Sequence, residues 1–263
     1  MSTTTFVLCV VGHFFFSLFM HSFFLHRYVT HEQFTMSRFW ERVFYFLTWF
    51  SQGPAFLHPK AYAMMHLEHH EHSDTKKDPH SPLNFSRSRL GLDFAVAAPR
   101  MMLATKRLYF QIKQEAHAIV ELYRQRKFPE WRWFEGFASS RSIMIVMGGL
   151  FASFFLFFAP TWWCWLLLPI SILSGPIQGG IVNWCGHMWG YRNHILPDNS
   201  RNTWALSTLT LGELFQNNHH HDPKRINFGE RWFEIDPIYW MILLFSKLGI
   251  VRLKPGLEVS VRI

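Results

Sequence analysis

The sequence has 263 residues, of which 49% are hydrophobic, and its formal net charge is +8. This length allows one or two soluble domains. However, no Lys, Arg, Asp or Glu occurs in residues 1–26 or in residues 142–191. A spanning helix needs roughly 20 mostly apolar residues, so this distribution excludes an ordinary soluble domain and indicates a membrane protein.

The positive charge lies outside these two windows. All 26 Lys and Arg side chains occur in the segments between or after them. Basic residues are typical of the cytoplasmic side of a membrane protein, where they also contact anionic headgroups. The positive charge is therefore interpreted as a sign of which segments lie on the cytoplasmic side. No nucleic-acid-binding motif accompanies it, so nucleic acid is not an expected partner.

Residues 4–25 are predicted to form the first membrane helix, which leads directly into the segment that carries His26 and His31. The aromatic-rich residues 39–57 contain charges and a Gly-Pro break. This mixture is typical of a helix that lies in the membrane interface, or dips into it and returns. Both segments therefore place the histidines that follow them near the membrane surface.

Residues 84–140 are polar and basic, and they are predicted to form amphipathic helices on the cytoplasmic side. The prediction rests on helical spacing, as in Leu103, Arg107, Phe110 and Gln114. The end of this segment, rich in tryptophan and phenylalanine, leads the chain back to the membrane surface.

A hairpin of two membrane helices is predicted next. Its arms are residues 142–158 and residues 161–186, with the turn at Ala159-Pro160. Pro169 and Gly175-Pro176 should kink the second arm, because proline interrupts helical hydrogen bonding.

The remainder of the chain, from His187, is predicted to form a cytoplasmic cap that ends in an aromatic helix over residues 237–249. We find no internal repeat and no flexible linker, so we expect a single domain over residues 1–263. The predicted fold class is an all-α membrane protein. It has about three transmembrane helices, interfacial helices and a cytoplasmic helical cap that carries the histidines.

Histidine is the unusual residue of this sequence, with 16 copies. The clustered copies are His26 and His31; His66, His69 and His70; and His219 and His220, preceded by Gln216. Imidazole is a ligand for iron, copper and zinc. Side chains three or four residues apart share a helix face, so His66 can converge on one ion with His69 or with His70.

The number of histidines indicates more than one ion. A structural zinc site usually has four ligands, and this sequence offers seven or eight. His187, at the end of the second hairpin arm, is the additional candidate, because an ionisable group at the edge of a membrane helix is a functional candidate. The alternative for His187 alone is a residue that anchors the helix at the interface.

Four segments together resemble the histidine boxes of membrane fatty acid desaturases, and in particular the bacterial relatives of stearoyl-CoA desaturase. They are His26-Arg-Tyr-Val-Thr-His31, His66-Leu-Glu-His69-His70 with Asp74 and Asp78, Asn183-x3-His187, and Asn217-Asn218-His219-His220. The tail from Trp232 to Asp236 is also similar. The resemblance covers nearly the whole chain.

This resemblance implies a centre of two iron ions that uses O2 as co-substrate, with two external electrons, to introduce a double bond into a fatty acyl chain. The iron ligands carried over by position are His26, His31, His66, His69, His70, His187, His219 and His220. Asn183 matches a family position that approaches one iron through a water. No catalytic residue beyond these ligands is expected.

Two departures from the family pattern stand out. Gln216 replaces the histidine that begins the family's third box, so it is expected to ligate weakly or to hold a water, with His221 as a neighbour that would compensate. Because of this departure, the position of the double bond is harder to predict from the family pattern, whereas the prediction of iron is affected less. The family also has a membrane hairpin before its first box where this chain has one helix, so we expect an N-terminus outside the cytoplasm or a shortened start.

Several polar residues lie near the histidine clusters in sequence. Asp74, Asp78, His72, His80 and Glu213 are candidates to orient the ligating imidazoles. The alternative is that they are solvated charges and helix caps.

The expected partners follow from the same resemblance. The substrate is a fatty acyl chain linked to coenzyme A or to a lipid, and membrane lipids surround an integral protein of a bacterial inner membrane with its active site on the cytoplasmic side. The sequence contains neither a cysteine cluster for iron–sulfur ligation nor a Gly-rich dinucleotide fingerprint. We therefore expect a separate electron donor of the ferredoxin or cytochrome type, with its reductase.

Two other functions use the same residues. A membrane di-iron hydroxylase or oxygenase of a lipid or hydrocarbon would have the same ligands and a different product. A non-catalytic membrane metal-binding protein would line a path across the membrane with its histidines, whereas these gather at one side. A degenerate, inactive relative is a third alternative, motivated by Gln216 alone.

Overall fold

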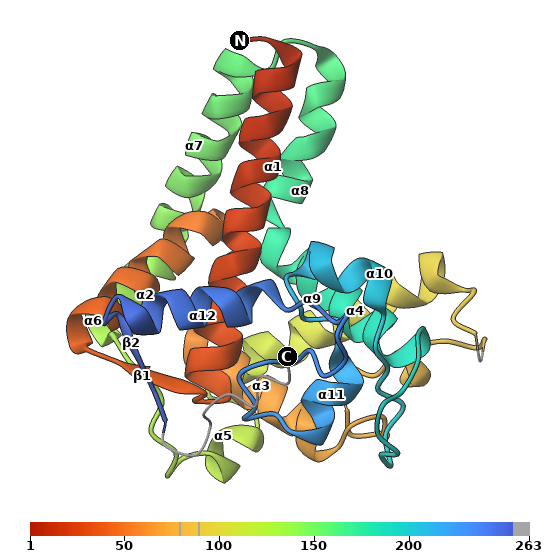
Figure 1. The fold of residues 1–263 in the computed structure, drawn as a ribbon. Helices are drawn as coiled ribbons and strands as arrows, with labels where there is room; N and C mark the ends of the chain where they lie inside the picture. The colour runs from red at the N-terminus through yellow and green to blue at the C-terminus, as the bar shows by residue number, and fades with distance from the viewer. Residues whose placement is uncertain (79, 89, 255–263) are drawn as a thin grey trace.

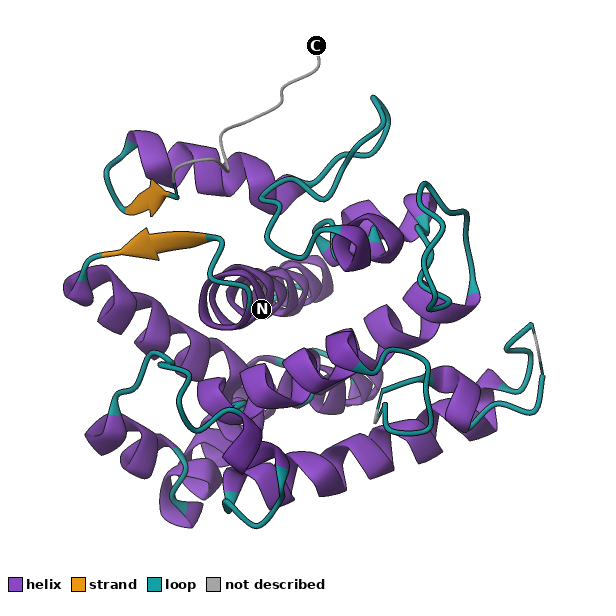
Figure 2. Ribbon diagram, turned by 90° about the horizontal axis from the view of Figure 1, so that it is seen from below, coloured by secondary structure: helices purple, strands orange, loops and turns teal. Residues whose placement is uncertain are grey.

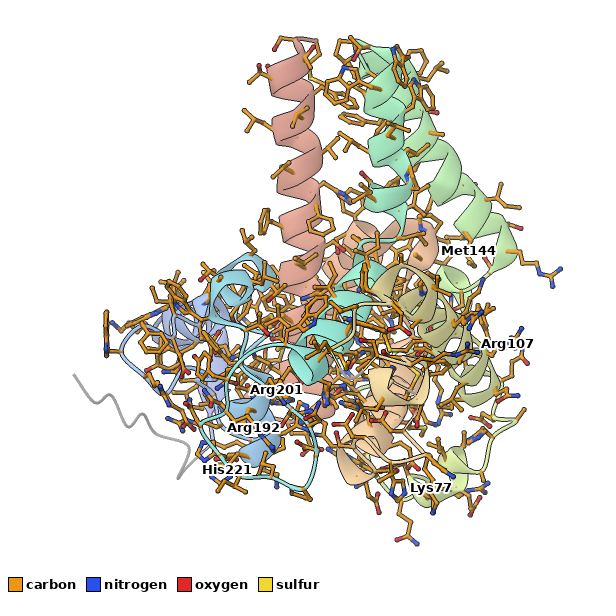
Figure 3. The ribbon with its side chains drawn as sticks, turned by 90° about the vertical axis from the view of Figure 1, so that its right-hand side faces the viewer. Lys77, Arg107, Met144, Arg192, Arg201 and His221 are labelled. Carbon is orange, nitrogen blue, oxygen red and sulfur yellow. The ribbon has the colours of Figure 1, made fainter. Side chains whose placement is uncertain are left out.

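The protein consists of a stalk of apolar helices that stands on a broader body, as the computed structural model shows (Figure 1). The structure describes residues 1–78, 80–88 and 90–254. The stalk comprises α1 (Thr3–Met20), α7 (Arg141–Phe158), η4 (Trp162–Leu167) and α8 (Leu168–Ile172). Side chains of the stalk are mostly carbon in Figure 3, whereas charged tips such as those of Lys77, Arg192 and Arg201 lie in the body.

The stalk has the dimensions of a membrane anchor. Thr3–Thr30 and Arg141–Phe158 are each long and apolar enough to cross a membrane. The helices Trp162–Ile172 and Ser174–Met188 meet at 72° and make a third crossing if they are counted as one span. The prediction of about three transmembrane helices in an all-α protein is therefore confirmed.

The bend in the second arm of the hairpin lies where the sequence places its helix breakers. α8 ends at Ile172, and after Leu173 the chain starts α9 (Ser174–Met188). Proline fits the first turn of a helix because the N–H it lacks would have no partner there. Pro176 therefore suits the start of a new helix at this position, as predicted from Gly175-Pro176. Below the bend, α9 enters the body and carries His187.

The first helix extends further than the sequence predicted. After Met20 it continues as a π-helix, η1 (His21–Thr30). A π-helix bonds each N–H to the carbonyl five residues back, and the N–H of His31 donates to the carbonyl of His26 at 3.1 Å. The predicted range of 4–25 ends too early because the apolar pattern stops at His26, although polar residues such as Arg27 are fully buried here.

A helix at the base of the stalk covers most of the predicted residues 39–57. α2 (Arg38–Gln52) buries one face and exposes Phe39, Phe46 and Phe50 on the other. It ends at Gly53, whose φ of 54° is a conformation that glycine adopts at little cost. This mixture of an inward and an outward aromatic face suits a helix at the membrane interface.

The predicted helices of residues 84–140 are present. The helices are α4 (Phe94–Lys113), α5 (Ile119–Leu122) and α6 (Arg132–Ala138). Leu103 and Phe110 are exposed, and the buried side includes Met101 and Ala97. Small residues allow α4 to pack closely on α9, where a Cβ at Gly180 would meet the Met102 sulfur at 2.8 Å. The face of α4 that packs in this way carries small residues, whereas the large Leu103 and Phe110 lie on the exposed face.

The body also contains short elements from both ends of the chain. They are β1 (Phe34–Met36), η2 (Gly53–Ala55), α3 (Pro59–Glu71), η3 (Pro82–Asn84), α10 (Trp204–Ser207), η5 (Thr208–Thr210), α11 (Gln216–His221), α12 (Pro237–Lys247) and β2 (Val251–Leu253). β1 and β2 pair antiparallel, with Phe34 opposite Leu253, and lie beside α12 (Figure 2). The predicted final helix is therefore confirmed as α12, whereas the small β-pair was not predicted.

The largest apolar core lies where η1 enters the body. Phe23 and Phe24 of η1 are fully buried, together with Tyr45 of α2 and Met64 of α3. η1 and α3 pack directly against each other. This packing fixes the two helices that carry the first five clustered histidines.

Candidate metal centre

The structure brings together all eight histidines that the sequence predicted as ligands. They form two groups, and within each group the candidate ligand atoms lie within 4.8 Å of one another. The five-histidine group contains His26, His31, His66, His70 and His219, and the three-histidine group contains His69, His187 and His220. Both groups lie in the body, at the inner ends of η1 and α9.

The π-helix explains the H-x4-H spacing of the first cluster. In an α-helix, residues five apart point to different faces. In a π-helix they share a face, and the rings of His26 and His31 lie with their centroids 4.7 Å apart. The sequence contains the spacing, but helical reasoning at 3.6 residues per turn does not predict this arrangement.

α3 divides its histidines between the two groups. His66 and His70, four residues apart, share a face, and their Nε2 atoms are 3.0 Å apart. His69 points to the three-histidine group, where its ring centroid lies 5.0 Å from that of His187. Of the two pairings left open by the sequence, the structure therefore selects His66 with His70.

α11 makes the same division with two adjacent residues. His219 Nε2 lies 3.1 Å from His26 Nε2 in the five-histidine group. The ring of His220 lies 4.9 Å from that of His187 in the other group. His220 also approaches His70, with ring centroids 4.4 Å apart. The two groups are therefore immediate neighbours.

Every ring in the three-histidine group has a carboxylate on its Nδ1. The pairs are His69 with Asp78, His187 with Asp74, and His220 with Asp198, each at 2.9 Å. The Nε2 atoms of the same three rings have no hydrogen-bond partner among the described residues. A carboxylate on one ring nitrogen fixes the proton there and leaves the other nitrogen as a donor to a metal.

The electrostatics keep these carboxylates ionised. Burial alone would raise the pKa of Asp78, but the charge of the His69 imidazole and its hydrogen bond outweigh burial and lower the pKa. Burial also opposes ionisation of Asp198, whose pKa is nevertheless lowered by its hydrogen bond with His220. Burial in turn lowers the pKa of His220 to about 4. The ring is therefore neutral at physiological pH, which is the form that ligates metals.

The five-histidine group has one such support in the described part of the chain. His26 Nδ1 lies 2.5 Å from Glu213 Oε2, and Glu213 also accepts a hydrogen bond from Ser22. Burial would raise the pKa of Glu213, but the charges of His26 and Arg27 lower it to about 2. Burial places the pKa values of His66 and His219 well below the usual value, so these rings are also neutral.

Arg27 links this group to the last third of the chain. The side chain is fully buried, and Nη2 lies 2.9 Å from Asp236 Oδ2. Arg27 Nη1 donates to the carbonyl of Ile226 at 2.6 Å, and the guanidinium lies 3.8 Å from the Phe228 ring centroid. Arg27, Asp198 and Asp236 were not predicted from the sequence as residues of the site. A charge next to His26 inside an otherwise apolar helix was the signal that pointed to Arg27.

The supporting residues proposed from sequence behave differently from one another. Asp74, Asp78 and Glu213 contact histidines of the two groups. For His72 the structure selects the alternative of a helix cap, since it follows the last residue of α3 and its Nε2 pairs with Glu68 at 3.3 Å along the same helix. His80 lies beside His69, with ring centroids 5.4 Å apart.

Gln216 and Asn183 lie close to the histidines without joining the two groups as defined. Gln216 is buried, and its Nε2 donates to the carbonyl of Glu213 at 2.6 Å. Its side chain contacts the backbone of Gly186, so it fills the space between α11 and α9. Asn183 is half-buried, one turn before His187 on α9. His221 does not compensate for Gln216, because it is exposed and stacks on His194 at 3.7 Å.

The donor set fits two metal ions. The eight imidazoles are buried or nearly so, several Nε2 atoms have no protein partner in the described structure, and four rings are oriented by carboxylates. Imidazole nitrogens suit iron, copper and zinc. The arrangement is therefore that of a candidate two-metal centre at the inner end of the stalk.

Comparison with known proteins agrees with this geometry. A family model described as fatty acid desaturase matches residues 2–245. The similar proteins include an sn-2 palmitoyl-lipid 9-desaturase from Nostoc sp. (strain 36), 42% identical over 71 residues, which are 27% of this chain and 25% of that protein. The Delta-9 desaturase-like 4 protein of Arabidopsis thaliana is 29% identical over 202 residues, covering 73% of this chain and 58% of the relative.

An sn-1 stearoyl-lipid 9-desaturase from Synechocystis sp. (strain ATCC 27184 / PCC 6803 / Kazusa) is 29% identical over 192 residues, which cover 72% of this chain and 53% of the relative. The chain thus spans somewhat more than half the length of the longer matches. The resemblance stated from the histidine clusters is confirmed by the family model and by these relatives, bacterial ones among them.

Proposed function

The chain belongs to the fatty acid desaturase family, and on that premise we propose that it is an oxygen-dependent oxidoreductase that introduces a double bond into a fatty acyl chain. The observation that carries the proposal is the pair of adjacent histidine groups. Distant segments of chain converge there, and the Nε2 atoms of His31, His69, His187 and His220 have no protein partner among the described residues. The Nostoc and Synechocystis relatives are named as lipid desaturases, which supports an acyl lipid as the substrate class.

We propose two irons as the metals, with one ion in each group. His26, His31, His66, His70 and His219 would hold the first, and His69, His187 and His220 the second. Gln216 and Asn183 remain proposed contributors to the second ion, directly or through a water. Iron with O2 supplies an oxidant strong enough for an unactivated C–H bond, which no side chain can supply.

The residues of the chain have separate tasks in this proposal. Asp74, Asp78 and Asp198 hold the Nδ1 protons of their histidines, so that each Nε2 is presented to a metal. Glu213 does the same for His26. Burial of the groups keeps water away from the reacting carbon, and the surrounding apolar core positions the acyl chain.

The proposed location is a bacterial inner membrane with the body on the cytoplasmic side. The stalk supplies the spanning helices, and the charged side chains lie in the body, as the labelled Lys77 and Arg107 illustrate (Figure 3). Basic residues on the cytoplasmic side agree with the usual charge bias. A separate electron donor of the ferredoxin or cytochrome type would approach the body.

The test is lipid profiling of a host that expresses the protein. The expected product is a fatty acyl chain that lacks two hydrogen atoms, detected by mass spectrometry. A product that gains an oxygen atom would instead assign the protein as a hydroxylase. The matched control is the variant with both His69→Ala and His70→Ala, which removes one member of each group.

That control must insert into the membrane at the normal level for the comparison to count. Unchanged lipids in the host with the unaltered protein, supplied with iron and an electron donor, would contradict the proposal. Metal bound without an oxygen-dependent product would support a metal-binding protein without this activity.

A further inference from the structure

A cluster of buried polar side chains lies where the stalk meets the body, on η1, α2 and α9. It consists of His21, Gln52 and Gln178, which are 5%, 0% and 3% exposed. We call this the His21–Gln52–Gln178 cluster. Polar groups inside a membrane segment are costly and usually mark a functional position.

The amide of Gln52 has a fixed orientation. Its Oε1 accepts the backbone N–H of Leu57 at 2.9 Å. Its Nε2 has no partner among the described residues, and neither does Nδ1 of His21. A Cβ at Gly175 would lie 3.2 Å from Gln52 Nε2 and 3.4 Å from His21 Nδ1, so both atoms face this glycine.

Gln178 lies on the same side of α9. The hydroxyls of Ser17 and Ser174 are hydrogen bonded at 2.6 Å and fix the level of α9 against the first helix. His21 lies four residues after Ser17, and Gln178 lies four residues after Ser174. Residues four apart share a helix face, so His21 and Gln178 lie on the two helix faces that meet at the serine pair. Both amide atoms of Gln178 lack a partner in the described structure.

The cluster adjoins the five-histidine group along two paths. His21 lies five residues before His26 on the π-helix, and therefore on the same face. The ring of Tyr62 contacts His21 edge-on at 4.9 Å and stacks on His66 at 5.8 Å. A group bound at the cluster is therefore held one helical turn from the candidate metal ligands.

Buried polar atoms in native proteins are nearly always hydrogen bonded, and an exception calls for a ligand or another functional reason. Here four atoms of three neighbouring side chains lack partners in the described protein. An amide N–H donor with a known direction, an imidazole and a second amide together suit an oxygen atom that accepts hydrogen bonds.

We propose that the His21–Gln52–Gln178 cluster binds an oxygen function of the acyl substrate and thereby fixes which carbon lies at the histidines. This inference rests on the proposed function. In either form of the substrate the bound group is an oxygen atom that accepts hydrogen bonds, and it lies close enough along the acyl chain for a carbon of that chain to reach the metal centre. It is either the ester or thioester carbonyl at the head of the acyl group or a hydroxyl further along the chain.

The test uses the full-length protein in lipid nanodiscs and the variant Gln178→Met, which keeps the length of the side chain and removes its hydrogen bonds. Thr48→Val is the matched control, because Thr48 is also buried but its hydroxyl donates to a carbonyl of its own helix. Competition against a fluorescent acyl probe, on the metal-loaded protein without an electron donor, measures binding without reference to activity. The competitors are an acyl ester, the alkyl ether that lacks its carbonyl, and a hydroxyacyl ester.

If the carbonyl is bound, the unaltered protein prefers the ester to the ether by about ten-fold, the size of one hydrogen bond. Gln178→Met abolishes that preference, and Thr48→Val retains it. If a chain hydroxyl is bound, the same pattern appears for the hydroxyacyl ester over the plain ester. The proposal is overturned if Gln178→Met changes neither preference while its metal content and insertion remain normal.

Product analysis separates this proposal from the proposed function. With the cluster intact, the double bond forms at one position, and in Gln178→Met it should spread over neighbouring carbons with a raised KM. A single unchanged position and KM in the variant would overturn the role of the cluster and leave the desaturase activity standing. Absence of any oxidised lipid with the unaltered protein would contradict the proposed function itself.

Discussion

The two histidine groups differ in the number of their rings and in how those rings are oriented. Each ring of the three-histidine group has a carboxylate on Nδ1, from Asp78, Asp74 or Asp198. The five-histidine group has more rings, but in the described part of the chain only His26 has such a support, from Glu213. The five-histidine group would thus hold a metal ion through many ligands. The three-histidine group would hold one through fewer ligands that carboxylates orient.

This comparison makes the three-histidine group the more sensitive of the two. Loss of one ring there leaves two, whereas the other group would retain four. The carboxylates of the three-histidine group also offset more of the positive charge of a bound ion.

The largest effect is expected for His69→Ala. It should release the ion of the three-histidine group and abolish desaturation, because two rings do not make a complete site. The measurement is the iron content per chain of the purified protein, which should fall by about half. His66→Ala should retain more iron, and equal losses in the two variants would break the proposed contrast.

Asp78→Asn should have the next largest effect. The amide cannot match the charge that orients His69, and loss of such a partner typically costs about 10- to 100-fold in metal affinity. Competition with a chelator measures that affinity. Asp93→Asn is the control, because that carboxylate accepts hydrogen bonds from Ser86 and the backbone of Arg87. A similar affinity in both variants would contradict the role of Asp78.

Glu213→Gln should lower metal affinity less, by about ten-fold, the lower end of the range for such partners. Four rings other than His26 still surround the ion of the five-histidine group. Glu135→Gln is the control, since this buried carboxylate accepts hydrogen bonds from Tyr45 and Trp131. If Glu213→Gln removes the ion entirely, ligand number does not protect that group.

The smallest effect is expected for Gln216→His. Gln216 lies four residues before His220 on α11 and so shares its face. A fourth imidazole should raise iron retention by the three-histidine group about two- to three-fold, while the lost bond to the Glu213 carbonyl limits the gain. Chelator competition again measures the change. Activity that appears only in this variant would identify the natural chain as inactive.

The convergence of the eight histidines and the apolar helices beside them were predictable from sequence because both leave strong local signals. Uncharged windows define the stalk, and paired histidines mark η1, α3 and α11. The assignment of each ring to a group was not predictable. Adjacent residues such as His219 and His220 separate according to the direction of each side chain, which depends on packing.

The missed residues share a different cause. Asp198 supports His220 from a loop, and no spacing along the chain connects the two. The spacing of residues 94–113 predicts a helix but not which side is buried, because close packing through Gly180 and Met102 leaves the larger Leu103 exposed. Tertiary contacts of this kind decide such cases, and pattern reasoning does not contain them.

The link between Arg27 and Asp236 has a consequence for biosynthesis. The first helix enters the membrane early in translation, yet Arg27 remains without its buried counter-ion until the ribosome has passed Asp236. His219 and His220 are also made late. Neither histidine group is therefore complete until the last part of the chain has been made, so a metal ion that needs a whole group would bind after release or in the final stages of synthesis.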